Sequence, residues 1–338
     1  MKKTLIVLIV AVITIAGGIW LYQNQKSAEN QKSAENQKSL VIIHQGSWFG
    51  DAPFYLAKEK GFFDKYGVKV EIKKVEEAQV RRQLLSSGGA DISAETIDMA
   101  VLDFGAGVNG KIFMALDTSL GADGIVATKE INKIQDLKGK KVGATKGDPP
   151  YFLLKYLMKE QGMSSSDIVF QDMPNADTAG TAFISGQLDA AGTWEPWLSK
   201  ASERVGGHVL VSSKDAPGVI VDVAVVRPEV LANRKKEVIG VMKAWFDAIE
   251  YWKNNPNEAN AIMAKEFDLK PDEFADLIKT IRWDDKDSNL SYFGSIDSKG
   301  KTFDVAQKII DIAREDQMIS KDLKANEIID LGVIDKIR

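Results

Sequence analysis

Two tryptophans and a carboxylate lie within four consecutive residues, Trp194-Glu195-Pro196-Trp197. Such a group could bind a cation, because indole rings attract positive charge to their faces and a carboxylate pairs with it. The apolar segment just before them is typical of a short strand, and open α/β sheets bind ligands at the carboxyl ends of strands. Alternatively, both tryptophans belong to the core and Glu195 only favours the amino terminus of a helix.

Similar side chains lie in loops that border other predicted strands, and together they form the set of candidate ligand-binding residues. The set is Trp48, Phe49, Asp51, Glu95, Thr96, Asp117, Ser119, Asp148, Trp194, Glu195, Trp197 and Asp222. Six of these residues are acids, whereas one base, Lys146, lies in the same loops. Helix amino termini could still hold an anion, but nearby carboxylates in a low-dielectric cleft would oppose it by several kcal/mol each. A guanidinium suits the set better, because it pairs with carboxylates through two hydrogen bonds and stacks on aromatic rings.

Several of the acids have structural explanations that the sequence leaves open. Asp51 and Asp148 lie shortly before prolines, where helix N-caps occur. Asp117 can shape a turn, and Trp48 can belong to the core. We interpret Asp123, which precedes a glycine, as a turn residue and leave it out of the set.

Composition narrows the classes of function. A chain of 338 residues with 44% hydrophobic and 27% charged residues is long enough for two globular domains, and a net charge of -4 gives no reason to expect nucleic acid. The absence of cysteine excludes thiol nucleophiles, disulfides and a lipid-modified cysteine. Of the two histidines, His44 lies inside an apolar segment and is interpreted as a core residue. We therefore expect no metal site, no cofactor and no catalytic residue.

The amino terminus is typical of a targeting segment. Two lysines precede the apolar residues 4–22, which are about long enough to span a bilayer as a helix with its start in the cytoplasm. We expect residues 1–22 to be a signal anchor or a signal peptide, and the polar repeats of residues 23–39 to be a linker. The remainder would then be exported to the periplasm or the extracytoplasmic side, and anchored to the cytoplasmic membrane if residues 4–22 are retained.

From residue 40 on, strand and helix patterns alternate, which predicts an α/β fold with mostly parallel sheets flanked by helices. The expected strands are residues 40–44, 68–75, 91–93, 111–116, 124–127, 141–144, 168–171 and 222–226. The expected helices are residues 53–60, 77–86, 150–161, 178–185, 238–253, 256–266, 271–281 and 302–313. We infer two lobes, residues 40–127 plus 223–338 with the C-terminal helices, and residues 128–222 inserted between them. Chain crossings near Thr128 and Val221 would form the hinge.

Four segments add a family resemblance. They are residues 46–71, beginning Gly46-Ser-Trp-Phe-Gly-Asp, then Asp136-Leu-Lys-Gly-Lys-Lys-Val-Gly, Gly186-Gln-Leu-Asp-Ala-Ala and Trp194-Glu-Pro-Trp. In the same order they resemble segments of the periplasmic solute-binding proteins that serve ABC importers of nitrate, sulfonate, taurine and thiamine precursors. The resemblance covers roughly residues 40–255 and implies a two-lobed type II binding protein that closes on a small solute and delivers it to a membrane permease. Residues 115–125 resemble a subgroup linked with urea carboxylase, which implies a guanidine-type solute.

We therefore expect a monomeric, extracytoplasmic solute-binding receptor that is not an enzyme and that works with an ABC permease and ATPase in the inner membrane. Its ligand would be a small cationic nitrogen compound of the guanidine or amine type, held by groups from both lobes. The first alternative is an alkanesulfonate, taurine or nitrate. The second is binding or synthesis of a thiamine-pyrimidine precursor, although the cysteine-rich segment of the synthesising relatives is missing here. Residues 105–111 have phosphate-loop spacing, but Ile112 lacks the hydroxyl that magnesium needs.

Overall fold

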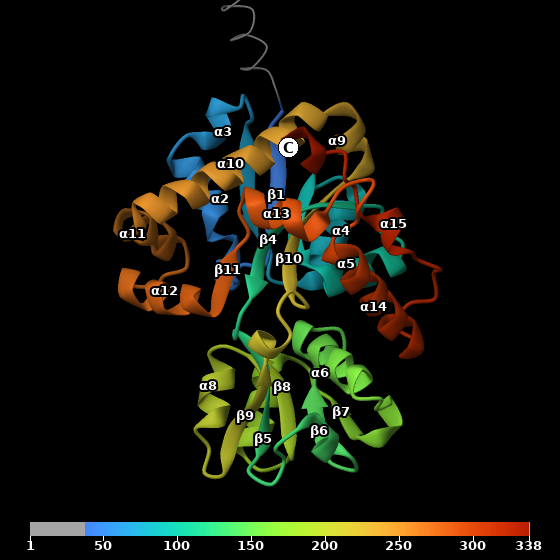
Figure 1. The fold of residues 1–338 in the computed structure, drawn as a ribbon. Helices are drawn as coiled ribbons and strands as arrows, with labels where there is room; N and C mark the ends of the chain where they lie inside the picture. The colour runs from blue at the N-terminus through green and yellow to red at the C-terminus, as the bar shows by residue number, and fades with distance from the viewer. Residues whose placement is uncertain (1–37, 338) are drawn as a thin grey trace, which may run out of the picture. The chain divides into compact units, whose positions relative to one another are not determined.

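Two β-sheets, each flanked by helices, make up the described part of the chain, residues 38–337 of a computed structural model (Figure 1). The six-stranded sheet has the order β11-β4-β10-β3-β1-β2 and consists of β1 (Leu40–His44), β2 (Val70–Lys74), β3 (Ile92–Thr96), β4 (Lys111–Ser119), β10 (Val221–Val226) and β11 (Ile281–Trp283). The five-stranded sheet has the order β7-β6-β8-β5-β9 and consists of β5 (Asp123–Thr128), β6 (Lys141–Ala144), β7 (Val169–Asp172), β8 (Ala190–Trp194) and β9 (Gly207–Ser212). We call these sheets with their helices the first and the second lobe.

The predicted anchor or signal segment, residues 1–22, lies outside the described residues, as does nearly all of the predicted linker. Within residues 38–337, none of the helices has the length and apolar character that crossing a membrane requires.

The expectation of mostly parallel sheets holds only for part of each sheet. Strand β1 runs parallel to β2 and β3, and β6 runs parallel to β7 and β8. In contrast, β10 is antiparallel to β3 and β4, β11 is antiparallel to β4, and β5 is antiparallel to β8 and β9. The reason is that β5 and β10 enter their sheets from the other lobe, at the edge where the parallel strands end. The starts of β5 and β10 therefore lie beside the carboxyl ends of β3, β4 and β8, where ligands are expected.

The first chain crossing lies earlier than the boundary expected at Thr128. The chain leaves the first sheet at Ser119 and enters the second sheet at Asp123, and it returns into β10 at Val221. At this crossing the Ser119 hydroxyl donates to Oδ2 of Asp123 over 2.6 Å and lies 2.8 Å from the Ser213 hydroxyl. The crossing from the first to the second sheet is thus hydrogen-bonded to Ser213, in the segment that leads back to β10.

Helices cover both sheets. The first lobe has α2 (Ala52–Glu59), α3 (Phe62–Lys65), α4 (Ala78–Ser87), α5 (Ile97–Gly105), α9 (Pro228–Asn233), α10 (Lys235–Asn254), α11 (Pro256–Glu266), α12 (Pro271–Leu277), α13 (Lys286–Phe293), α14 (Lys301–Glu315) and α15 (Ala325–Ile328). The second lobe has α6 (Pro149–Glu160), α7 (Ala176–Ile184) and α8 (Trp197–Ser202). Helix α10 packs on α2, α3 and α11, and its fully buried Trp245 packs against Phe54 of α2. Helix α14 packs on α5 and also on α6 of the second lobe.

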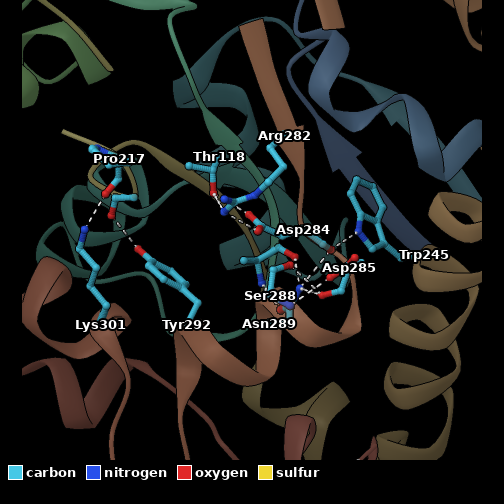
Figure 2. A network of polar contacts seen from close by, with 12 residues as sticks. Thr118, Pro217, Trp245, Arg282, Asp284, Asp285, Ser288, Asn289, Tyr292 and Lys301 are labelled. Atoms are coloured by element: carbon cyan, nitrogen blue, oxygen red, sulfur yellow. Dashed lines mark hydrogen bonds and ion pairs between the residues drawn. The ribbon is translucent and has the colours of Figure 1, made fainter. Parts of the chain in front are cut away.

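A network of hydrogen bonds from α13 and from the segment before it holds strand β4 in place (Figure 2). The side-chain amide of Asn289 in α13 donates to the carbonyl oxygen of Ala115 over 2.9 Å and accepts from its N–H over 2.8 Å, as a neighbouring strand would. The Thr118 hydroxyl donates to Oδ2 of Asp284 over 2.6 Å, and the Trp245 indole donates to the Asp284 carbonyl over 3.2 Å. These bonds hold β4 in place just where it carries Asp117.

The segment that leads into β10 is fixed by the same helices (Figure 2). Lys301 of α14 donates to the carbonyl oxygen of Pro217 over 2.5 Å, and the Tyr292 hydroxyl of α13 donates to that of Gly218 over 3.2 Å. The C-terminal helices therefore position β4 and β10, the two strands that carry acidic residues described next.

Candidate ligand-binding site

Three polar side chains lie side by side in the middle of the first sheet. Asp222 of β10 pairs in register with Thr96 of β3 and with Asp117 of β4. Because directly opposed residues of antiparallel strands point to the same face, the three side chains share one face of the sheet. Asp117 is 0% exposed and Asp222 is 5% exposed. One carboxyl oxygen of each, Oδ1 of Asp117 and Oδ2 of Asp222, has no hydrogen-bond partner among residues 38–337.

Two indole rings and a glycine border this face. The 3-10 helix η1 (Phe49–Asp51) follows Trp48, whose Nε1 donates to Oδ2 of Asp117 over 3.3 Å. The Trp283 Nε1 of β11 donates to the carbonyl oxygen of Gly50 over 2.7 Å. A Cβ atom at Gly50 would lie 2.2 Å from Oδ2 of Asp117 and 2.3 Å from Nε1 of Trp48. The close approach of η1 to Asp117 therefore requires glycine at this position.

The two acids for which helix capping was the alternative do not cap with their side chains. Asp51 and Asp148 occupy the N-cap positions of α2 and α6, yet neither side chain forms a capping hydrogen bond. Asp51 is 1% exposed, its Oδ2 lies 3.4 Å from Nδ1 of His44, and its Oδ1 has no partner in the described part of the chain. His44, which we interpreted as a core residue, is fully buried but faces this carboxylate, while its Nε2 lies 2.7 Å from the Tyr55 hydroxyl.

The structure adds two acids that the sequence analysis did not select. Asp98 lies in the first turn of α5, a helix that was not expected, and is 1% exposed. Its Oδ2 is also without a hydrogen-bond partner within residues 38–337. Asp123, interpreted as a turn residue, is the first residue of β5 and is 3% exposed. The sequence pattern gave no signal for it, because the chain crossing was expected near Thr128 and not before β5.

Burial raises the pKa of these carboxyl groups, and their mutual repulsion raises it further. For Asp117, burial and then the neighbouring Asp51 carboxylate raise the pKa well above its usual range. For Asp222, burial acts first, followed by Asp117 and Asp51. Burial, with Asp148 and Asp123 nearby, raises the pKa of Asp98 to about 8.

The second lobe takes part in the same electrostatic group. Burial, followed by Asp148 and Glu195, raises the pKa of Asp123 to about 7. Burial also raises the pKa of Asp148 to about 6, although Arg81 opposes this. Carboxyl groups from both lobes are therefore close enough to repel one another. We call the group the acidic cluster, and its members are Asp51, Asp98, Asp117, Asp123, Asp148 and Asp222.

The Trp-Glu-Pro-Trp segment lies next to this cluster, but Glu195 and Trp197 already contact residues of α8. Trp194 ends β8 and pairs with Asp123 of β5. The carboxylate of Glu195 accepts hydrogen bonds from the N–H and the hydroxyl of Ser199 in α8, over 3.2 and 2.8 Å. The Lys200 ammonium lies 4.4 Å from the centre of the Trp197 ring. The alternative role of Glu195 at a helix amino terminus is therefore present in the structure.

Three further candidates are engaged in other contacts. Phe49 is buried in the core, with its ring 4.8 Å from that of Trp48. Glu95 precedes Thr96 in β3 and so points to the opposite face of the sheet, where it accepts from the Ser93 hydroxyl over 3.0 Å. Ser119 is engaged at the chain crossing. In the part of the chain that the structure describes, no three His, Cys, Asp or Glu side chains are arranged to hold a metal ion.

Both the sequence and the fold of this chain are similar to those of known proteins. A family model described as NMT1/THI5 like matches residues 48–259. A Bacillus subtilis protein named as a candidate aliphatic sulfonates-binding protein is 27% identical over 286 residues, 82% of each chain. The periplasmic aliphatic sulphonate binding protein SsuA from Escherichia coli has a TM-score of 0.71 at 19% identity, over 87% of this chain and 98% of that one. The desulfurization enzyme DSZB has a TM-score of 0.60 at 12% identity, over 89% and 98%. These two structures show a shared fold.

Proposed function

The chain belongs to the NMT1/THI5 like family, and from this premise we propose that it is an extracytoplasmic solute-binding receptor of an ABC importer that binds a small cation of the guanidine or amine type. The family resemblance seen in the four sequence segments is confirmed by the family model. The proposal includes an ABC permease and ATPase as partners, delivery rather than catalysis, and residues 1–22 as the segment that directs export. The observation that carries the ligand class is the acidic cluster.

A bound cation would offset the repulsion between the ionised carboxylates of this cluster. Two ionised carboxylates about 4 Å apart repel by roughly 4 kcal/mol at the effective dielectric constant of a protein site. The free guanidinium ion has six N–H donors in one plane, and these match the unpaired carboxyl oxygens of Asp51, Asp98, Asp117 and Asp222. Trp48 and Trp283 border the same place, and their indole N–H groups donate to Asp117 and to the Gly50 carbonyl, which fixes the side of the site next to these acids.

An alkanesulfonate is the alternative, because the named relatives in Bacillus subtilis and Escherichia coli are described as binding sulfonates. A sulfonate in the same place would repel every ionised member of the acidic cluster. It would bind only after those carboxyl groups had taken up protons, which their raised pKa values favour at low pH. The two ligand classes therefore predict opposite dependences of affinity on pH.

The test is a thermal-shift panel followed by calorimetric titration between roughly pH 5.5 and pH 8.5, which spans the pKa values of about 6, 7 and 8 of Asp148, Asp123 and Asp98. The panel contains guanidine, methylamine, urea, taurine, ethanesulfonate, nitrate and a thiamine-pyrimidine precursor. A ligand at a hundredfold excess over its Kd stabilises by about 2.7 kcal/mol.

We expect guanidine or methylamine to stabilise the protein and to bind at least about tenfold more tightly at the upper end of this pH range, because binding displaces protons. Stabilisation by ethanesulfonate alone, with affinity that rises as the pH falls, would replace the cation with the sulfonate. Turnover of any panel member would indicate an enzyme.

A further inference from the structure

A polar cavity shares one residue, Asp148, with the acidic cluster. It has a volume of about 180 Å³ and lies between α4, β3 and α5 of the first lobe and the loop before α6 of the second lobe. Its charged lining residues are Arg81, Arg82, Glu95, Asp103, Lys146 and Asp148. Asp148 belongs to both places, since it lines this cavity and is a member of the acidic cluster. We call it the Arg81 cavity.

Arg81 is a buried guanidinium whose hydrogen bonds go to neutral groups. It is 2% exposed, and its Nη1 donates to the carbonyl oxygens of Val75 and Glu76 over 2.8 and 2.7 Å. Its Nη2 lies 4.0 Å from the Met99 sulfur, and its Nε has no hydrogen-bond partner within residues 38–337. A buried charge normally has an opposite charge in direct contact, because burial without one is costly. The side chain of Arg81 therefore has both an unused donor and a charge that carbonyl groups do not neutralise.

Cations outnumber ionised acids in the lining of the cavity: Arg81, Arg82 and Lys146 face Asp103 and Asp148. Burial raises the pKa of Asp148 and the Arg81 charge opposes this rise, so that charge is balanced in part from there. Arg82 pairs with Asp103, whose Oδ1 lies 2.7 Å from its Nε, so these two charges offset each other. The Lys146 ammonium donates to the carbonyl oxygen of Asp316 over 2.9 Å, which is again a neutral acceptor. Burial raises the pKa of Glu95 to about 8, so near pH 7 this side chain is mostly a neutral acid whose O–H can donate a hydrogen bond. Its Oε1 is unpartnered in the described part of the chain, and the residue is 5% exposed.

We propose that the Arg81 cavity binds an oxyanion carried by the same solute whose cationic nitrogen lies in the acidic cluster, so that the ligand is a small zwitterion. The inference rests on the proposed function, because it takes the acidic cluster as the place of the cation. Arg81 Nε and the Lys146 ammonium are the donors to the oxyanion. Since one comes from each lobe, the oxyanion adds a contact that exists only while the lobes are together.

Two matched ligand pairs test the inference on the full-length protein by calorimetric titration. Methylguanidine and guanidinoacetate differ by a carboxylate, and ethylamine and taurine differ by a sulfonate. We expect the zwitterion of at least one pair to bind about tenfold more tightly than its cationic partner, and the pair concerned identifies the oxyanion. In Arg81→Met and Lys146→Met this preference should fall to about threefold or less, since each variant lacks one donor. In Lys141→Met, an exposed lysine of β6 outside the cavity, the preference should persist.

The outcomes separate the inference from the proposed function. Equal affinity within both pairs, or a preference that survives in both cavity variants, would overturn the zwitterion while methylguanidine binding still supported the cation receptor. Binding of ethanesulfonate without binding of either cation would overturn both. Circular dichroism of each variant checks folding, and if Arg81→Met does not fold, Lys146→Met decides, because Lys146 lies on an exposed loop.

Discussion

Asp117 lies at the centre of the acidic cluster. It is fully buried on β4, faces Asp222 across the strand pair, and accepts a hydrogen bond from Trp48. A buried carboxyl group that repels its neighbours and leaves one oxygen unpaired destabilises the ligand-free fold. Residues of this kind are typical of functional sites, where the cost is recovered when a ligand binds.

Asp117→Asn separates these two effects. The amide oxygen can still accept from Trp48, but the charge is lost. We expect the affinity for methylguanidine to fall at least about tenfold and the Tm of the ligand-free protein to rise, because one source of repulsion is removed. Calorimetric titration and differential scanning calorimetry measure the two quantities on the same samples.

Two variants calibrate that result. Asp64→Asn changes an exposed acid of α3 and should alter neither quantity. Glu195→Gln changes an acid already bonded to Ser199, so we expect a smaller loss of affinity than in Asp117→Asn. Unchanged affinity in Asp117→Asn would remove this residue from the site.

Residue types in loops indicated several of the acids that the structure brings together, but not all of them. The excess of acids over bases was visible in the sequence, and Asp51, Asp117 and Asp222 were selected from it. Asp98 and Asp123 were not, because their burial depends on α5 and on the crossing into β5. Glu195 was selected, although its local helix contact was also predictable from the serine four residues later.

At the level of elements, the sequence pattern located most strands and helices but not their pairing. Strands β1 and β6 and helix α11 have the expected limits. Helix α5 was missed because its nine residues lie between two strands and are nearly all apolar, so that they show no clear polar face. The helix expected over residues 271–281 ends at Leu277, since Ile281 and Trp283 instead pair with β4. That pairing depends on a strand more than 150 residues away along the chain, which no local pattern contains.

The approach of η1 to β4 is the element-level contact that forms the indole side of the site. In Gly50→Ala the new methyl group would overlap Oδ2 of Asp117 and Nε1 of Trp48, so their hydrogen bond cannot persist in its present geometry. Overpacking of this kind costs about 1–3 kcal/mol. We expect a lower Tm together with weaker methylguanidine binding, and quenching of tryptophan fluorescence by acrylamide should show a more accessible indole.

Gly46→Ala is the matched control for this change. A Cβ atom at Gly46 would lie 3.1 Å from Oε2 of Glu76 and 3.2 Å from Cβ of Lys74, both exposed residues, so the overlap is much smaller than at Gly50. If Gly46→Ala and Gly50→Ala lowered binding equally, the specific contact between η1 and Asp117 would not be the cause.

For the molecule as a whole, the two lobes meet through contacts of opposite character. Helix α6 is bonded to the end of α14, where Lys155 lies 2.9 Å from Asp316 and Lys159 lies 2.6 Å from Glu315. Within the acidic cluster, in contrast, Asp123 and Asp148 of the second lobe repel carboxylates of the first. A cation would turn that repulsion into attraction, so its binding would favour the approach of the lobes.

The acidic cluster also predicts how the stability of the ligand-free protein depends on pH. Asp98, Asp123 and Asp148 have pKa values of about 8, 7 and 6 in the folded state, above the value of about 3.9 for an unfolded aspartate. Between roughly pH 4 and pH 8, the folded state therefore holds more protons than the unfolded state. The stability that these three groups contribute is then fully present below about pH 4, and it is lost as the pH rises through their folded pKa values.

We expect the Tm of the ligand-free protein to fall by at least about 5 °C between roughly pH 5 and pH 8.5, and to fall less in Asp123→Asn, which lacks one of the titrating groups. Saturating methylguanidine should flatten the decline, because a bound cation stabilises the ionised carboxylates that the rising pH produces. Differential scanning calorimetry at constant ionic strength measures all three series. A ligand-free Tm that stays constant or rises over this range would mean that the carboxyl groups ionise without cost, and a cation would then gain nothing from neutralising them.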